Sequence, residues 1–168
     1  KVVVKEKSSD SSAIGRMENE AVWLKKLNPL GIGPKFCSSG KDFVIMAYVP
    51  GIRILEWIPE HSRQEIRAVM LDILKQCRKL DELSANKEEM HNPYKHILVR
   101  SKKATMIDFE RCRFVVEPQN VSQFCQFLMS ANVNRMLQNK GITLDKENLI
   151  SILKHYKKTH SNFNEVLK

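Results

Sequence analysis

The stretch Met106-Ile107-Asp108-Phe109-Glu110 places a carboxylate directly after a short apolar run. A second apolar run, Val2-Val3-Val4, leads into a positive charge at Lys5. Runs of β-branched residues favour strands, and Val2-Val3-Val4 predicts a buried one. A carboxylate at a strand end can hold Mg²⁺ against phosphate oxygens, and a lysine there can reach the same oxygens as a point charge. A capping aspartate in a turn is the alternative for Asp108, but the pair predicts a phosphate site.

Such a lysine needs an acidic partner. Met17, Ala21 and Leu24 recur at helical spacing, which predicts a helix from Met17 that ends at Asn28, before a proline. Glu20 lies inside this helix and is the expected partner of Lys5, with Glu18 as the alternative. Each residue alone is more typical of an ordinary surface charge, but their joint placement favours the pair.

The remaining elements follow from periodicity and turn residues. We expect a polar loop at Ser8–Ser12, strands at Pro34–Ser38 and Phe43–Val49 joined by a turn at Ser39–Asp42, a long helix at Arg63–Ser84, a hairpin of Ile97–Val99 and Ala104–Ile107, and helices at Val121–Asn132, Asn134–Asn139 and Leu144–Lys158. Strands come first and helices follow, which predicts the α+β class.

Composition limits the partners. The 168 residues suffice for one domain or for two small lobes that share a cleft. The net charge of +9 favours anionic partners such as nucleotide phosphates, RNA or an acidic surface, although a solvated basic face is the simpler alternative. No apolar run approaches the ~18 residues of a spanning helix, so we expect a soluble, cytoplasmic protein.

The four cysteines, Cys37, Cys77, Cys112 and Cys125, occur singly, without C-x-x-C spacing. This pattern argues against a zinc site and against a disulfide scaffold, and it fits a reducing compartment. We expect them to be small buried thiols.

Three further motifs accompany these charges. They are Gly31-Ile32-Gly33-Pro34, Met46-Ala47-Tyr48-Val49-Pro50-Gly51 and Pro93-Tyr94-Lys95-His96-Ile97-Leu98-Val99. With Ile107-Asp108-Phe109-Glu110, the last of these makes the sequence resemble the RIO-type, lipid-kinase-like branch of small protein kinases, especially a group of predicted archaeal Ser/Thr protein kinases. The resemblance covers residues 2–110, and residues 111–168 carry no comparable motif.

The resemblance implies a reduced two-lobed, protein-kinase-like fold. Residues 1–49 would form a small antiparallel-sheet lobe with one helix, and residues 50–168 a mostly helical lobe. ATP and Mg²⁺ would bind between them. The family's glycine-rich loop would lie upstream of Lys1.

Site roles carried over from the resemblance place Lys5 on the phosphates and Glu20 beside it. Met46 would be the gatekeeper, and the backbone of Ala47, Tyr48 and Val49 the adenine-binding hinge. Asp108 would bind metal and Glu89 would be the general base. His96 stands where these kinases carry a metal-holding asparagine. A histidine there could hold metal, hydrogen-bond phosphate or be purely structural, and the sequence leaves these three open.

Two departures bear on activity. Lys87-Glu88-Glu89 replaces the expected H-G-E or H-R-D, so the bracing histidine is missing, and Glu110 replaces a glycine, which is expected to hold Asp108 in one conformation. The implied activity is ATP-dependent phosphorylation of a Ser/Thr hydroxyl on a protein or of a small molecule. The alternatives are a pseudokinase that acts as an interaction module and an RNA- or ribosome-associated factor.

Overall fold

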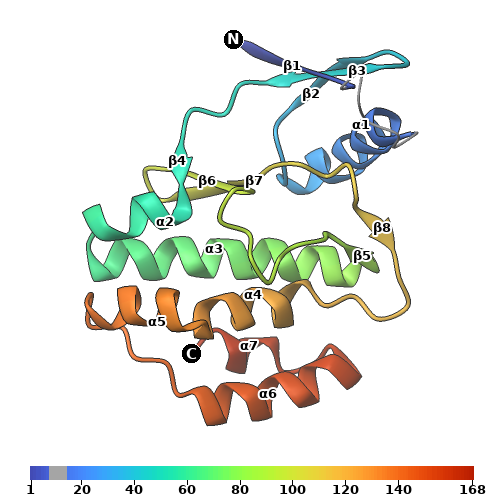
Figure 1. Cartoon of the computed structure of the whole chain (residues 1–168). Coiled ribbons are helices and arrows are strands. Elements are labelled where there is room, and N and C mark those ends of the chain that lie inside the picture. The colour runs from blue at the N-terminus through green and yellow to red at the C-terminus, as the bar shows by residue number, and fades with distance from the viewer. Residues whose placement is uncertain (8–14) are drawn as a thin grey trace.

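Three antiparallel strands and one helix form the upper part of the molecule in Figure 1. The computed structural model describes residues 1–7 and 15–168, so the loop predicted at Ser8–Ser12 lies outside the described residues. The strands are β1 (Val2–Glu6), β2 (Phe36–Ser39) and β3 (Phe43–Ala47), in the order β1-β3-β2. Helix α1 (Arg16–Leu27) packs on β2 and β3, and a 3₁₀ turn η1 (Asn28–Leu30) follows it. Mixed α+β architecture, the class predicted from the sequence, is what the structure has.

Helix α1 buries the predicted apolar stripe. Met17, Ala21, Leu24 and Leu27 are all at most 5% exposed. The α-helix ends before Asn28-Pro29, as predicted, but Asn28 keeps helical backbone geometry (φ −60°, ψ −38°) and the chain continues there as the 3₁₀ turn η1. Glu20 lies on the same buried face, so the helix carries one fully buried charge toward the sheet.

Strand β1 forms as predicted, but it is not buried. Val2, Val3 and Val4 keep 56%, 39% and 51% of their surface exposed. Among the described residues β1 pairs only with β3, so it is an edge strand, and side chains on its open side meet no further strand. The prediction of a buried strand was wrong because β-branched composition does not separate edge strands from central ones.

Below this sheet the chain forms a second small sheet over a long helix (Figure 1). The sheet has the order β4-β6-β7, and the predicted hairpin is present as β6 and β7, with a tighter turn at residues 101–102. The elements of this part are β4 (Ile52–Arg53), α2 (Ile54–Trp57), η2 (Ile58–Glu60), α3 (Arg63–Glu82), β5 (Ala85–Asn86), β6 (Ile97–Arg100), β7 (Lys103–Met106) and β8 (Arg113–Phe114), with β5 paired to β8.

Four helices lie under α3 and complete the layers (Figure 1). They are α4 (Asn120–Met129), α5 (Ala131–Gln138), α6 (Lys146–Thr159) and α7 (Phe163–Val166). The helix predicted at Val121–Asn132 is too long, because the backbone of Ser130 leaves helical geometry (ψ 147°) and starts α5 as its N-cap. No helix within the described residues has both the length and the apolar character needed to cross a membrane.

Three of the four cysteines are buried, as predicted, but Cys37 is exposed. It lies on β2, the other edge of the first sheet, where side chains alternate between the α1 side and the outside. All four are free thiols.

Asp81, near the end of α3, joins three helices through buried hydrogen bonds. Its Oδ1 accepts from the amide and side chain of Asn120 (2.9 and 2.7 Å), and its Oδ2 accepts from the Tyr156 hydroxyl (2.9 Å). Asn120 Oδ1 in turn accepts from the Lys87 amide at 2.8 Å. The start of the loop after β5 is therefore fixed to α3 and α4.

Replacing Asp81 by alanine is expected to lower the free energy of unfolding by about 3 kcal/mol, because buried donors of Asn120 and Tyr156 lose their acceptor. Urea denaturation measures this loss. The matched control is Asp145→Ala, which removes an exposed helix cap that accepts only from the Asn148 amide (3.0 Å); it should cost about 1 kcal/mol. Equal losses in the two variants would contradict the structural role of the Asp81 network.

Candidate active site

The ammonium of Lys5 lies at the junction of β1, α1 and the loop after β7. Its Nζ donates to Glu20 Oε2 at 2.9 Å and to Asp108 Oδ1 at 2.8 Å. Glu110 Oε2 lies at 2.9 Å from the same nitrogen. Of the two candidate partners, Glu20 makes the contact, whereas Glu18 is exposed on the outer side of α1. Lys5 and Asp108, 103 positions apart in the sequence, thus contact each other directly.

Charge pairing controls the ionisation of this cluster. Burial alone would lower the pKa of Lys5, but the charge of Glu20 and hydrogen bonds to three carboxylates outweigh it and raise the pKa above its usual value. Burial would raise the pKa of Asp108, but the hydrogen bond and the charge of Lys5 outweigh it and lower that pKa. Lysine and aspartate are therefore both charged at neutral pH. A permanently ionised carboxylate is what a divalent cation requires.

The loop from Asp108 to Cys112 is held against α1. Asp108 adopts left-handed backbone geometry (φ 66°), and the amide of Phe109 donates to Glu20 Oε1 at 2.9 Å. Asn19 donates its side-chain amide to the carbonyls of Glu110 (2.8 Å) and Cys112 (2.9 Å). One turn of α1 therefore fixes both the direction of the Asp108 carboxylate and the path of the chain after it.

The Phe109 ring explains the glycine-rich turn after α1. A Cβ added to Gly33 would lie 3.0 Å from Phe109 and 3.0 Å from Leu24, and Gly33 has a positive φ of 80°. Only glycine fits both the backbone conformation and the close approach. Gly33 thus lets the fully buried Phe109 pack against α1, next to Asp108.

An apolar cleft of about 360 Å³ opens beside Lys5. Its volume falls within the range of small-molecule sites. The cleft is lined by β1, α1, the turn before β2, the end of β3 with the segment after it, and the hairpin with the loop after it. The lining residues are Val3, Val4, Lys5, Glu20, Pro34, Met46, Ala47, Tyr48, Val49, Leu98, Ile107 and Asp108. The predicted gatekeeper and all three predicted hinge residues therefore line one cleft with the Lys5 cluster at its end.

The backbone amides of the three predicted hinge residues differ in whether they have a hydrogen-bond acceptor. The amide of Ala47 donates to Lys35 O (2.8 Å) and that of Tyr48 to Lys1 O (3.0 Å). The amide of Val49 has no hydrogen-bond acceptor among the described residues. Val49 also lines the cleft, so of these three amides its own is the one left free for a ligand.

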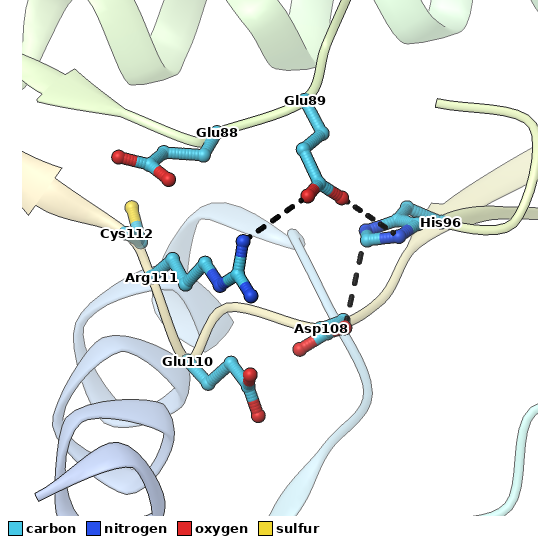
Figure 2. A pocket seen from close by; sticks show the side chains of 7 residues that line it. All are labelled: Glu88, Glu89, His96, Asp108, Glu110, Arg111 and Cys112. Atoms are coloured by element: carbon cyan, nitrogen blue, oxygen red, sulfur yellow. Dashed lines mark hydrogen bonds and ion pairs between the residues drawn. The ribbon is translucent and has the colours of Figure 1, made fainter. Parts of the chain in front are cut away.

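A second, smaller pocket of about 130 Å³ lies on the other side of Asp108 (Figure 2). In Figure 2 the Glu89 carboxylate points toward both His96 and Arg111, with Oε2 3.2 Å from His96 Nε2 and Oε1 3.3 Å from Arg111. His96 Nδ1 lies 4.0 Å from Asp108 Oδ2. Glu89 also has a left-handed backbone (φ 67°), a costly conformation for a residue of this type. The predicted base, metal ligand and histidine are thus neighbours.

Lys87 is the residue of this site that sequence reasoning missed. It is 1% exposed, and its Nζ donates to the carbonyl of Asp108 at 2.9 Å. The same nitrogen lies 3.5 Å from His96 Nδ1 and 5.2 Å from the centre of the Phe109 ring. The sequence showed only a missing histidine at this position. The available signal was the position of Lys87 in the motif Lys87-Glu88-Glu89, because the resemblance expects a bracing histidine at that position.

Oxygen ligands suitable for Mg²⁺ are present at Asp108. The carboxyl groups of Glu20, Asp108 and Glu110 offer atoms within 4.8 Å of one another, but the Lys5 ammonium contacts all three, so this group is an ion-pair cluster. The second oxygen of Asp108 faces the pocket of Figure 2 instead. His96 has Glu89 at one ring nitrogen and Lys87 at the other. That arrangement favours the structural role among its three alternatives.

No protein-family model matches the chain, and no curated protein matches it. What the structure shows is an α+β protein with small antiparallel sheets, a charged cluster centred on Lys5, and two adjoining pockets that share Asp108.

Proposed function

We propose that the chain is an ATP-dependent phosphotransferase of the protein-kinase-like type that acts on a Ser/Thr hydroxyl. The observation that carries this proposal is the contact of one ammonium, Lys5 Nζ, with both Glu20 (2.9 Å) and Asp108 (2.8 Å) at the end of an apolar cleft. Phosphoryl transfer needs mainly positioning and positive charge near the phosphate oxygens, and this cluster supplies both.

Adenine is the part of ATP that suits the cleft. The lining of Val3, Met46 and Leu98 is apolar and matches a flat aromatic base, while the unpaired amide of Val49 can donate to a ring nitrogen. The triphosphate would then extend toward Lys5 and Asp108. Substrate binding would place phosphate oxygens where Lys5 now contacts carboxylates.

Asp108 is the residue that would hold Mg²⁺. One of its carboxylate oxygens is occupied by Lys5, and the side chain keeps 35% exposure, so the other oxygen remains accessible. When bound, the ion would neutralise negative charge on the phosphates.

Glu89 would act as the general base. Its carboxylate is 43% exposed beside Asp108 and is oriented by His96 and Arg111. As the acceptor oxygen bonds to the γ-phosphorus, the bond from that phosphorus to the β–γ bridging oxygen breaks and ADP leaves. Glu89 takes the proton of the acceptor hydroxyl.

The pseudokinase is the second candidate, and one contact favours it. Glu110 stands where the family has glycine, and its carboxylate lies 2.9 Å from Lys5 and 3.3 Å from Arg16. Lys5 must therefore also break its ion pair with Glu110 before it can bind a phosphate. This cost weakens nucleotide binding.

Two measurements on the purified chain separate these candidates. Thermal unfolding is followed with ATP plus Mg²⁺, with Mg²⁺ alone and with ATP alone, and γ-labelled ATP is used to detect transfer to the protein itself, to a Ser/Thr-rich peptide mixture or to water. The proposal expects stabilisation by the ATP–Mg²⁺ pair and labelled product. Stabilisation without product would support the pseudokinase, and no stabilisation would contradict the phosphotransferase.

The general base gives a sharper prediction. Glu89→Gln is expected to lower the transfer rate by about 10²- to 10⁴-fold, because an amide cannot accept the hydroxyl proton. The affinity for ATP should stay unchanged, since Glu89 does not line the adenine cleft. Glu117→Gln, the same change at an exposed residue, is the control. A full transfer rate in Glu89→Gln would remove Glu89 from this role.

A further inference from the structure

Lys87 is a buried ammonium without a carboxylate partner. The side chain is 1% exposed, and no carboxylate of the described residues lies within ion-pair distance of its Nζ. Burial lowers its pKa, although the charges of Asp108, Glu20 and Glu89 oppose this. Burying a charge in this way is costly, so a stabilising or functional gain must offset it.

Three acceptors surround the three protons of this ammonium. They are the carbonyl of Asp108 (2.9 Å), the Nδ1 of His96 (3.5 Å) and the face of the Phe109 ring (5.2 Å to its centre). The backbone of Lys87 is fixed as well, because its amide donates to the buried Asn120. The lysine is thus held at its main chain and directs its head group at the metal-binding segment.

The contact with His96 determines the tautomer of its ring. Lysine can only donate, so the Nδ1 that faces it must accept, and the proton lies on Nε2. That nitrogen is 3.2 Å from Glu89 Oε2 and donates to it. A chain of hydrogen bonds therefore runs from Lys87 through His96 to Glu89.

We propose that Lys87 is a positioning residue that ties the metal-binding Asp108 to the base Glu89. It holds the Asp108 carbonyl directly, and it holds Glu89 through the Nε2–H tautomer of His96. This inference rests on the proposed function for its effect on rate. It also makes Lys87 the replacement for the histidine that the sequence lacks, and His96 a connector rather than a metal ligand.

The test compares Lys87→Met, which keeps the apolar length but no donor, with Lys87→Gln, which keeps a neutral donor. Lys103→Met, at an exposed lysine of β7, is the control. The His96 tautomer is read by long-range ¹H–¹⁵N NMR at pH 8 without nucleotide, with the signal assigned by a His96→Gln variant. We expect Nε2–H in the wild type, in Lys87→Gln and in Lys103→Met. In Lys87→Met, Nδ1 loses the donor that faces it, and Asp108 Oδ2 (4.0 Å) is the carboxylate oxygen beside that nitrogen. A proton should therefore appear on Nδ1, alone or together with the one that Glu89 holds on Nε2.

Steady-state kinetics give the second readout. In Lys87→Met, kcat should fall about 10²-fold with little change in KM for ATP, because misplacing catalytic groups affects the transition state more than binding. Lys87→Gln should recover part of this loss. If Lys87→Met is folded and keeps both the Nε2–H tautomer and the wild-type kcat, the proposal is overturned.

The NMR measurement of the His96 tautomer tests the role of Lys87 independently of the proposed phosphotransferase activity. A wild-type chain that transfers no phosphate would refute the phosphotransferase, and the NMR comparison would still decide whether Lys87 orders His96. If Lys87→Met does not fold, Lys87→Gln decides alone: an Nδ1–H ring in that variant would overturn the proposal.

Discussion

Replacing Lys5 by alanine is expected to reduce phosphoryl transfer by about 10³-fold or more. A preorganised positive donor aimed at developing negative charge is typically worth 10²- to 10³-fold in rate. Lys5 also makes the contacts that join β1, α1 and the Asp108 loop, so the variant loses orientation in addition to charge. Both effects act in the same direction.

The same substitution should destabilise the fold, and this must be separated from chemistry. Without the ammonium, the fully buried Glu20 keeps, among the described residues, only the Phe109 amide as a donor, and it lies beside the carboxylates of Asp108 and Glu110. Breaking a buried ion pair by removing one partner is strongly unfavourable, although the partial exposure of Lys5 reduces the cost. The double variant Lys5→Ala/Glu20→Gln should regain stability, because it removes the orphaned charge, but it should not regain activity.

Initial-rate assays and thermal unfolding on the same samples measure the two effects. Lys7→Ala, an identical change two residues away at an exposed position, should leave both at wild-type values. Glu18→Gln is the matching control for Glu20→Gln, since Glu18 is exposed and lies two residues away on the same helix. Wild-type transfer in a folded Lys5→Ala variant would remove the proposed site.

Sequence patterns over neighbouring residues predicted the secondary-structure elements that depend mainly on near neighbours. The stripe of Met17, Ala21 and Leu24 specifies α1 because helical periodicity depends on near neighbours. Three elements are too short to show a periodic pattern, so the sequence did not predict them. They are the two-residue strands β5 and β8 and the four-residue helix α2. They form because tertiary contacts of the flanking segments bring their residues together.

In the candidate site, too, some contacts were predicted from the sequence and others were not. The pairing of Lys5 with Glu20 followed from the order of motifs, since a strand lysine and a helix glutamate in that order are expected to meet. The motif order marked position 87 only as the place of a missing histidine, and it did not show what Lys87 contacts. A lysine in a sequence is usually a surface residue, and what makes this one different is a carbonyl 21 positions away and a ring nine positions away. Only the fold brings those acceptors to it.

Replacing Asp108 by asparagine is expected to abolish the dependence on Mg²⁺ together with the transfer activity. The amide oxygen still accepts from Lys5, so the fold and the Lys5–Glu20 pair should survive. The negative charge that a divalent cation requires is lost. Metal stabilisation of phosphate charge is worth several kcal/mol, which corresponds to a rate loss of about 10³-fold.

Calorimetric titration with ATP in the presence and absence of Mg²⁺ distinguishes loss of metal from loss of nucleotide. Wild-type affinity should rise with Mg²⁺, whereas Asp108→Asn should bind ATP with an affinity that Mg²⁺ does not increase. The proposed adenine site at residues 46–49 is left unchanged, and one fewer negative charge would face the phosphates. Asp42→Asn, in the exposed turn between β2 and β3, should behave as the wild type. If Mg²⁺ strengthened ATP binding equally in Asp108→Asn, the ion would have to be held by other groups, and the assignment of Asp108 as the metal ligand would fail.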